Sequence, residues 1–361
     1  MQVHIRQSLT HVPPYRQGKQ PVPGASKLSS NESPHPPLPS VVEAVAQQLG
    51  AFHRYPDIAA LPVRSLLTDQ LGVAVDNITL GAGSVEVAAQ LIHAVTDPGD
   101  EVMFAWRSFE AYPSLVRIAG AVPVEVPLDD NAAHDLDAML AAITPRTRLI
   151  FICNPNNPTG TVVAAEALEA FIAAVPHNVL VVVDEAYVHF DRTPDRADGI
   201  KLFHRHPHVA VLHTFSKAYG LAGLRIGYAV SPPLVAEALR KVAVPFGVTS
   251  LAQAAAVASL EAEEELAARI NEVVTQRERM FATLTDAGLD PVASQANFVW
   301  VPDQNAAGVS AAALGEHLEA GGVVARVFPG EGIRISSGDA TDIDRVVAAI
   351  GTLAAQQPAA V

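Results

Sequence analysis

The chain contains one cysteine, Cys153, in 361 residues, which excludes an internal disulfide framework. Basic residues are also scarce, because 24 lysines and arginines stand against 38 acidic residues and give a formal net charge of −14. This balance, without a basic stripe, argues against nucleic acid as a partner. No apolar run is long enough to cross a membrane, and the first residues lack the apolar core of a signal peptide. We therefore expect a cytoplasmic protein with no nucleic-acid or membrane partner.

Apolar residues make up 49% of the chain and charged residues only 17%, as is typical of a folded globular protein with room for two domains. Between residues 101 and 230, short apolar runs alternate with helical stretches, which predicts βαβ units around a mostly parallel sheet. Ahead of this region, Ser40 is expected to cap a helix. Beyond it, residues 251–284 are predicted to be helical, and apolar runs at 297–301 and 332–335 predict strands of a C-terminal α+β domain.

Three apolar runs in the central region end in polar segments. The runs at 149–153, 180–183 and 209–212 are predicted to be buried strands. They lead into NPNNPTG at 154–160, DEAY at 184–187 and HTFSKAYGLAGLRIGY at 213–228. In open α/β sheets the carboxyl ends of the strands form the ligand-binding edge. We therefore expect the three polar segments to meet at one edge of the sheet.

Lys217 is the candidate reactive residue. It follows the third of these strands, lies between Ser216 and Arg225, and has Gly220 and Gly223 nearby to permit a tight bend. A lysine among anion-binding groups is placed to form a Schiff base with a phosphorylated aldehyde, as pyridoxal phosphate requires. That cofactor also needs a carboxylate at its ring nitrogen, donors at its phenolic oxygen and a cradle for its phosphate. Without the surrounding motif, a solvated loop lysine would be the more common case.

In combination and in this order, NPNNPTG, DEAY and SKAYGLAGLR resemble the fold-type I pyridoxal-phosphate aminotransferases, in the histidinol-phosphate aminotransferase-like group. The resemblance extends from residue 14 to residue 336. It implies an α/β fold in which a large domain with a mostly parallel sheet is joined to a smaller α+β domain. The implied division is an N-terminal arm at 1–35 that contributes to the small domain or the dimer, a large cofactor-binding domain at 36–260 and a small domain at 261–361.

The resemblance also implies the roles of the residues around the cofactor ring. Lys217 would hold the cofactor aldehyde and act as general acid and base. Asp184 would pair with the ring nitrogen, Tyr187 and Asn157 would donate to the phenolic oxygen, and Phe109 would stack on the ring. Outside this family, Asp184 would be an ordinary helix cap, Asn157 a turn residue and Phe109 a core aromatic residue.

The cofactor phosphate would be held at a glycine turn. The turn GAGS at 81–84 precedes a predicted helix at 85–95, and a helix N-terminus favours an anion. The ligands that the resemblance implies are Gly83, Ser84, Ser216 and Arg225. The chain departs from the family at Val85, where an acidic residue is common, so no side-chain contact is expected from that position.

Further roles concern the substrate and the subunit interface. Arg334 matches the arginine that binds the substrate carboxylate. Further candidates for the substrate site are Tyr15, Asn31 and Arg326. Tyr55 matches a tyrosine that reaches the cofactor phosphate of a neighbouring subunit. This match implies a homodimer with shared active sites.

The implied reaction is the transfer of an amino group from an amino acid to a 2-oxo acid such as 2-oxoglutarate. The segments FAWRSFEAYP at 104–113 and SQANFVW at 294–300 resemble the branch that acts on the aromatic amino acids phenylalanine, tyrosine and tryptophan. Histidinol-phosphate transamination is the alternative, because Arg326 and Arg334 together suit a phosphate. A pyridoxal-phosphate-dependent lyase is a further alternative, since the same fold and cofactor residues serve lyases.

No metal site is expected. The histidines of HRHPH at 204–208 lack the ligand spacing and the fixed frame of a zinc site. Cys153 and Trp300 are expected to be core residues.

Overall fold

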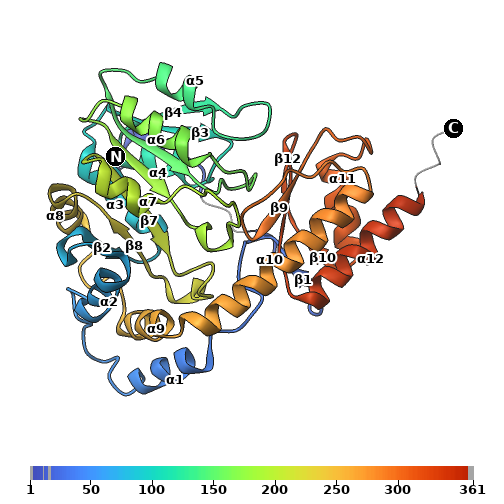
Figure 1. Ribbon diagram of the computed structural model, residues 1–361, viewed down its shortest axis with the longest axis horizontal. Helices are drawn as coiled ribbons and strands as arrows, with labels where there is room; N and C mark the ends of the chain where they lie inside the picture. The colour runs from blue at the N-terminus through green and yellow to red at the C-terminus, as the bar shows by residue number, and fades with distance from the viewer. Residues whose placement is uncertain (1–2, 11, 15–17, 357–361) are drawn as a thin grey trace.

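The structure is a computed structural model that describes residues 3–10, 12–14 and 18–356. A seven-stranded sheet flanked by helices forms its larger part (Figure 1). In spatial order the strands are β2 (Ile78–Gly81), β8 (Gly227–Val230), β7 (Val209–Thr214), β6 (Leu180–Asp184), β5 (Thr147–Cys153), β3 (Glu101–Trp106) and β4 (Val122–Pro127). Neighbouring strands from β7 to β4 are parallel, and β8 is antiparallel to both β2 and β7. The predicted α/β class with a mostly parallel sheet is confirmed.

Both faces of this sheet are buried, which explains why its strands are continuous apolar runs. On β5, Ile150 and Ile152 point into one core, and Phe151 and Cys153 point into the other. One face is covered by α3 (Ser84–Val95), α4 (Tyr112–Ala119) and α8 (Pro233–Val242). The other face is covered by α2 (Leu61–Leu71), α5 (Leu136–Ala141), α6 (Ala165–Ala174), α7 (Gly199–Arg205) and α9 (Ser250–Glu261), with α1 (Pro39–Gln48) packed on α9 (Figure 1).

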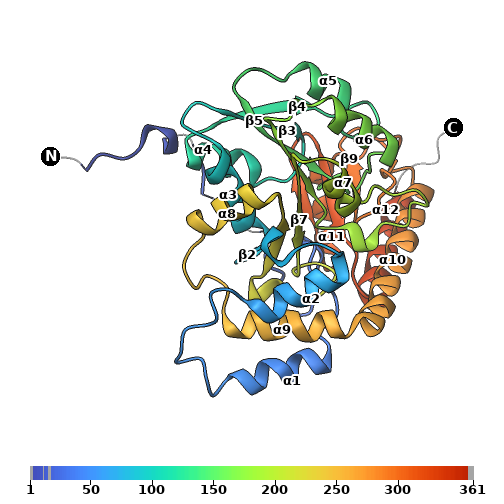
Figure 2. The ribbon, with the colours of Figure 1, turned by 60° about the vertical axis from the view of Figure 1, so that its left-hand side comes forward.

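A separate core lies in the C-terminal part of the chain. Its antiparallel sheet has the order β11 (Arg326–Phe328), β12 (Gly332–Ser336), β9 (Phe298–Pro302). The helices of this part are α10 (Glu263–Asp286), α11 (Ala311–Ala320) and α12 (Ala340–Gln356), and α10 lies beside α12 (Figure 2). Met280, Leu314 and Ile343 join the three helices in one apolar cluster with the sheet. The division of the chain at residues 35 and 260 stays a prediction.

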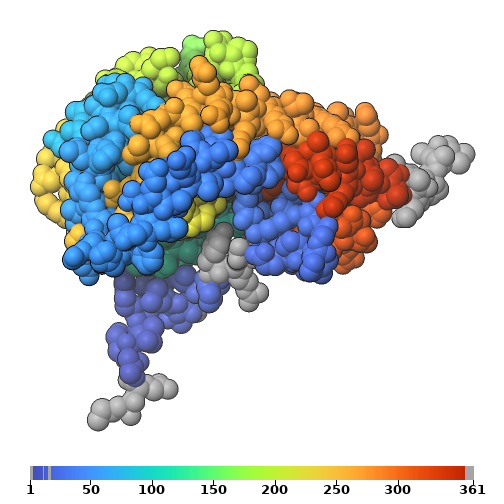
Figure 3. All heavy atoms as spheres, turned by 90° about the horizontal axis from the view of Figure 1, so that it is seen from below, coloured from blue at the N-terminus to red at the C-terminus, as the bar shows by residue number. Residues whose placement is uncertain are grey.

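The segment ahead of α1 packs against this second core. Ser26 and Lys27 form β1, which pairs in parallel with β10 (Val323–Val324). Arg345 of α12 donates a 3.0 Å hydrogen bond to Oγ of Ser26. In the space-filling view, the blue N-terminal part lies against the red C-terminal part (Figure 3). The pairing brings the residues that follow β1 to the edge of the large sheet.

Two details of the helices differ from the sequence prediction. Ser40 is not the cap of α1, because the helix begins at Pro39 and Leu38 occupies the cap position without a side-chain hydrogen bond. Proline suits a first helical position, since its missing N–H would have no intrahelical partner there. The helical region at 251–284 is divided between α9 and α10, which meet at Ala262. None of the described helices is long and apolar enough to cross a bilayer.

Candidate active site

A cavity of about 770 Å³ opens at the carboxyl edge of β5, β6 and β7. The strand register explains its position, because Cys153 at the end of β5 pairs with Asp184, and Asp184 pairs with Leu212 of β7. The loops that follow these strands therefore leave the sheet side by side. Of the residues predicted to bind the cofactor, the cavity is lined by Ser84, Phe109, Asn157, Asp184, Tyr187, Ser216, Lys217 and Arg225.

Lys217 lies just beyond the end of β7, partly buried in the cavity wall. Its ammonium group donates a 3.3 Å hydrogen bond to the backbone oxygen of Asn31. Burial, followed by the positive charge of Arg334, lowers the pKa of Lys217 to about 8. A substantial fraction of the amine is therefore neutral near physiological pH, as a nucleophile or general base requires.

Asp184 is the last residue of β6 and is buried beside the cavity. The hydroxyl of Tyr112 donates a 2.6 Å hydrogen bond to its Oδ2, and the backbone N–H of Ala186 donates a 3.2 Å bond to its Oδ1. Burial raises the pKa of Asp184, while the bond from Tyr112 opposes this shift. A buried carboxylate that faces a cavity is suited to pair with a cationic group of a ligand.

Tyr187 and Asn157 are connected to the second core by hydrogen bonds. Asn31 donates a 3.0 Å bond to the hydroxyl of Tyr187, and Nη1 of Arg334 donates a 2.5 Å bond to Oδ1 of Asn157. Arg334 also donates from Nη2 to the backbone oxygen of Ser29 at 3.0 Å. Burial raises the pKa of the Tyr187 phenol, so this residue stays a donor over a wide pH range. Tyr187, Asn157 and Arg334 therefore lie next to one another.

The residues of the predicted phosphate cradle lie together at the N-terminus of α3. Gly83 precedes this helix with a φ of +86°, and Ser84 is its first residue. Arg225 donates from Nη1 to Oγ of Ser216 at 3.3 Å and from Nη2 to the backbone oxygen of Ala82 at 3.3 Å. A Cβ on Gly83 would lie 2.1 Å from Nη2 of Arg225, so only glycine leaves room for the guanidinium. Backbone N–H groups, a hydroxyl and an arginine at a helix N-terminus fit a phosphate group.

Phe109 lines the same cavity and packs edge-on against Tyr112, with ring centroids 5.4 Å apart. It also borders a recess of about 130 Å³ that shares Asn157, Tyr187 and Lys217 with the main cavity. The recess contains the predicted substrate residues Asn31, Arg326 and Arg334. The sequence-predicted cofactor and substrate residues thus adjoin each other around Lys217.

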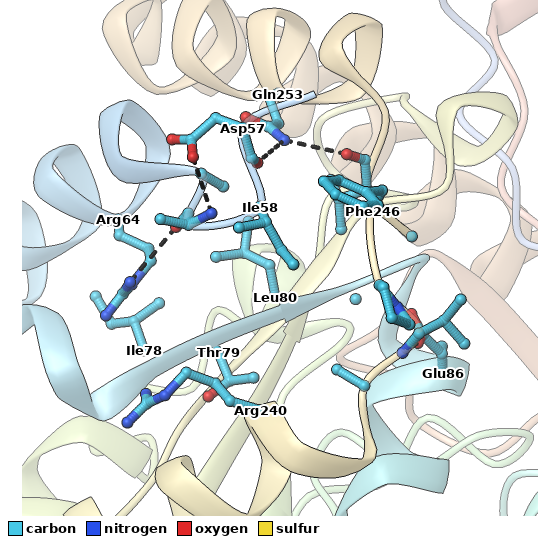
Figure 4. A pocket seen from close by; sticks show the side chains of 18 residues that line it. Asp57, Ile58, Arg64, Ile78, Thr79, Leu80, Glu86, Arg240, Phe246 and Gln253 are labelled. Carbon is cyan, nitrogen blue, oxygen red and sulfur yellow. Dashed lines mark hydrogen bonds between the residues drawn. The ribbon is translucent and has the colours of Figure 1, made fainter. Parts of the chain in front are cut away.

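The predicted residue Tyr55 lines neither this cavity nor the recess. Tyr55 is 81% exposed and stacks on Phe246 at a centroid distance of 4.5 Å. Phe246 borders a different cavity of about 350 Å³, which Figure 4 shows between β2 and the segment that carries Gln253. Tyr15 lies outside the described residues. The role of Tyr55 at a neighbouring subunit stays a prediction.

Two residues at the site, Tyr112 and Glu110, make contacts that the sequence did not predict. Tyr112 donates a hydrogen bond to Asp184. The sequence offered one indication, because the hydroxyl of a buried tyrosine needs a hydrogen-bond partner. Glu110 forms an ion pair with Arg326, at 3.0 Å between Oε1 and Nη2.

Val85, where the chain departs from the family, lines the main cavity as an apolar residue. The neighbouring Glu86 accepts a hydrogen bond from the backbone N–H of Ala82.

The histidines of the segment 204–208 form no metal cluster. Among the described residues, no group of three or more His, Cys, Asp or Glu side chains is arranged to hold a metal ion. Cys153 is buried, and burial raises the pKa of its thiol, which keeps it protonated. Trp300 is also buried, in β9, as expected for a core residue.

The fold and the cavity that contains Lys217 and Asp184 are those of a pyridoxal-phosphate enzyme of fold type I. Residues 24–350 match the aminotransferase class I and II family, and the chain belongs to this family. It is 53% identical over 339 residues to the aromatic amino acid aminotransferase of Cutibacterium acnes, which covers 94% of this chain and 95% of that protein. The protein of the same description from Streptomyces avermitilis is 52% identical over 338 residues, 93% of each chain.

A solved structure supports the same class. The chain is similar, with a TM-score of 0.83 and 31% identity, to the histidinol-phosphate aminotransferase of Sinorhizobium meliloti, whose structure contains pyridoxal-5'-phosphate. The alignment covers 91% of both chains. The relatives in sequence and in structure thus represent the two substrate branches that the sequence left open.

Proposed function

We propose that this protein is a pyridoxal-phosphate-dependent transaminase that transfers the amino group of phenylalanine, tyrosine or tryptophan to 2-oxoglutarate. The observation that carries the proposal is the placement of Lys217, Asp184, Tyr187 and Arg225 on the wall of one cavity. The sequence relatives described as aromatic amino acid aminotransferases favour aromatic substrates. The cavity also has apolar walls that suit an aromatic side chain, formed by Leu9, Val12, Pro13, Phe109, Leu115 and Ile118.

The side chains divide the chemistry among them. Bound pyridoxal phosphate supplies the electron sink that stabilises the charge left when the substrate loses its Cα proton. Asp184 would keep the ring nitrogen protonated, and Tyr187 and Asn157 would donate hydrogen bonds to the phenolic oxygen. Arg334 binds the substrate carboxylate. Lys217 Nζ would move the proton from Cα of the substrate to the aldehyde carbon of the cofactor, a task for which a pKa of about 8 is suitable.

The proposal is tested with purified enzyme, pyridoxal phosphate, phenylalanine and 2-oxoglutarate. We expect phenylpyruvate and glutamate in equal amounts, and a loss of turnover of at least about a hundredfold in Lys217→Ala, because the general acid and base is removed. Formation of ammonia or pyruvate in place of glutamate would support a lyase instead. Full turnover by Lys217→Ala would refute the assignment of the site.

We further propose that the enzyme is a cytoplasmic homodimer. Exposed apolar side chains lie around Tyr55, including Phe52, Ile58 and Phe246, and such a patch suits burial against a second copy. Sedimentation analysis is expected to give twice the chain mass of 38.0 kDa. A fully active monomer would contradict shared active sites.

A further inference from the structure

Arg326 and Arg334 are direct neighbours across the antiparallel strands β11 and β12. Both residues line the recess of about 130 Å³, together with Lys217. Like charges that face each other across a strand pair repel one another unless nearby groups offset the charge. Two adjacent arginines would also make a strong site for a doubly charged anion such as a phosphate ester.

The described hydrogen-bond partners of the two arginines differ in charge. Arg334 donates to neutral oxygens, the amide of Asn157 and the backbone of Ser29. Arg326 donates from Nη2 to both carboxylate oxygens of Glu110, at 3.0 and 3.4 Å. Glu110 contributes the one carboxylate among the described residues that line the recess.

The position of Glu110 follows from the local chain. It comes directly after Phe109, and both residues line the recess. About a quarter of each side chain in the Glu110–Arg326 pair is exposed, so water screens the pair only in part. The segment that presents the aromatic ring therefore also delivers a negative charge to Arg326.

We propose that Glu110 is a specificity-determining residue, which offsets the charge of Arg326 and adapts the recess to the singly charged carboxylate of an amino acid. A phosphate dianion would need the charge of both arginines, and it would be repelled by the carboxylate of Glu110. This inference rests on the proposed transaminase function and refines it. Glu110 takes no part in the reaction itself, but its charge favours an aromatic amino acid over histidinol phosphate.

The chain offers a matched control. Arg107 and Glu331 form a second ion pair between the same two regions, the segment that contains Phe109 and the hairpin of β11 and β12. Neither residue lines the main cavity or the recess. Glu331→Gln therefore removes a comparable contact between these regions without changing the charge of the recess.

The test compares kcat/KM for histidinol phosphate and for phenylalanine in the holoenzyme. Glu110→Gln is expected to raise the ratio of the first to the second by about tenfold, a change typical of one charge at a binding site. Glu331→Gln is expected to leave the ratio unchanged, and Glu110→Asp should stay close to the parent enzyme. An unchanged ratio in Glu110→Gln, or an equal shift in Glu331→Gln, would overturn the proposal.

A binding measurement separates this inference from the proposed function. Calorimetric titration of the holoenzyme with inorganic phosphate does not depend on which amino acid is turned over. Glu110→Gln is expected to bind phosphate about tenfold more tightly than the parent enzyme and Glu331→Gln. Unchanged phosphate binding contradicts the role of Glu110, whereas absent turnover of phenylalanine by the parent enzyme contradicts the aromatic substrate.

Discussion

The hydroxyl group of Tyr112 donates a 2.6 Å hydrogen bond to Oδ2 of Asp184 inside the core. Tyr112 is the first residue of α4 and Asp184 ends β6, so the bond connects a helix to the strand end that faces the cavity. The Tyr112 ring is fixed by stacking on Phe151 at a centroid distance of 4.5 Å. The bond thus orients the carboxylate and opposes the effect of burial on its pKa.

Tyr112→Phe removes this bond and leaves the ring packing in place. Loss of a hydrogen bond to a buried charged group costs about 1–3 kcal/mol, so we expect kcat to fall by about tenfold. The pKa of Asp184 should rise, which moves the acidic limb of the kcat profile to higher pH. Steady-state kinetics across pH checks both effects. Tyr228→Phe is the control, since Tyr228 is buried against His213 and does not line the cavity; equal effects of both variants would argue against the assignment.

Gly83→Ala is expected to weaken the binding of pyridoxal phosphate. A new Cβ would displace the Arg225 guanidinium from its position beside Ser216. We expect affinity to fall by about tenfold or more, as for the loss of a charge-assisted hydrogen bond. Gly99→Ala is the matched control, because Gly99 has a φ of +92° and open space around it.

Both alanine variants should lower the thermal unfolding temperature of the cofactor-free protein, because alanine is strained at a positive φ. Equilibrium titration with the cofactor distinguishes them. Equal cofactor affinity in Gly83→Ala and Gly99→Ala would show that Arg225 is not part of the phosphate cradle.

Arg334→Lys is expected to raise KM for phenylalanine by roughly tenfold. Lysine keeps the positive charge. It has too few donors in the right geometry to bond to Asn157 and Ser29 and, at the same time, to bind a carboxylate through two parallel hydrogen bonds. Initial-rate measurements with phenylalanine at saturating 2-oxoglutarate test this effect. Arg107→Lys changes an arginine outside the cavity and should leave KM as it is; an unchanged KM in Arg334→Lys would exclude it from the carboxylate site.

The pKa of Lys217 predicts how the cofactor-free protein captures pyridoxal phosphate. Only the neutral amine attacks the aldehyde, and burial lowers the lysine pKa from 10.5 to about 8. The capture rate should therefore rise through about pH 8 and then level off. Arg334→Gln should move this midpoint upward, because the charge of Arg334 is the second cause of the shift. Stopped-flow absorbance measures the rate, and a midpoint near that of an ordinary lysine would contradict the buried site.

The sequence predicted the site residues at the ends of strands, but it did not predict the residues that form hydrogen bonds and ion pairs with the site residues. Asp184 ends one apolar strand and Lys217 lies just beyond the end of another, so their position at the sheet edge followed from local pattern alone. The hydrogen bond from Tyr112 to Asp184 spans 72 residues, and the pair of Glu110 and Arg326 spans 216. No local pattern specifies such partners, because they depend on how helices and the second core pack on the sheet.

The same limit applies to the fold. Alternating apolar and helical runs predicted the parallel sheet, whereas no local pattern indicated that β8 runs antiparallel to both of its neighbours. The break at Ala262 between α9 and α10 also lacked a signal, since neither proline nor glycine occurs there. The cap of α1 was predicted wrongly because Pro39, and not Ser40, determines where the helix begins.

The central claim is that this transaminase acts on aromatic amino acids, and one comparison tests it most directly. In the holoenzyme, with 2-oxoglutarate as the acceptor, kcat/KM is measured for phenylalanine and for histidinol phosphate. We expect phenylalanine to be preferred by at least about tenfold, because the cavity has apolar walls and the Glu110 carboxylate is paired with Arg326. A preference for histidinol phosphate would contradict the account.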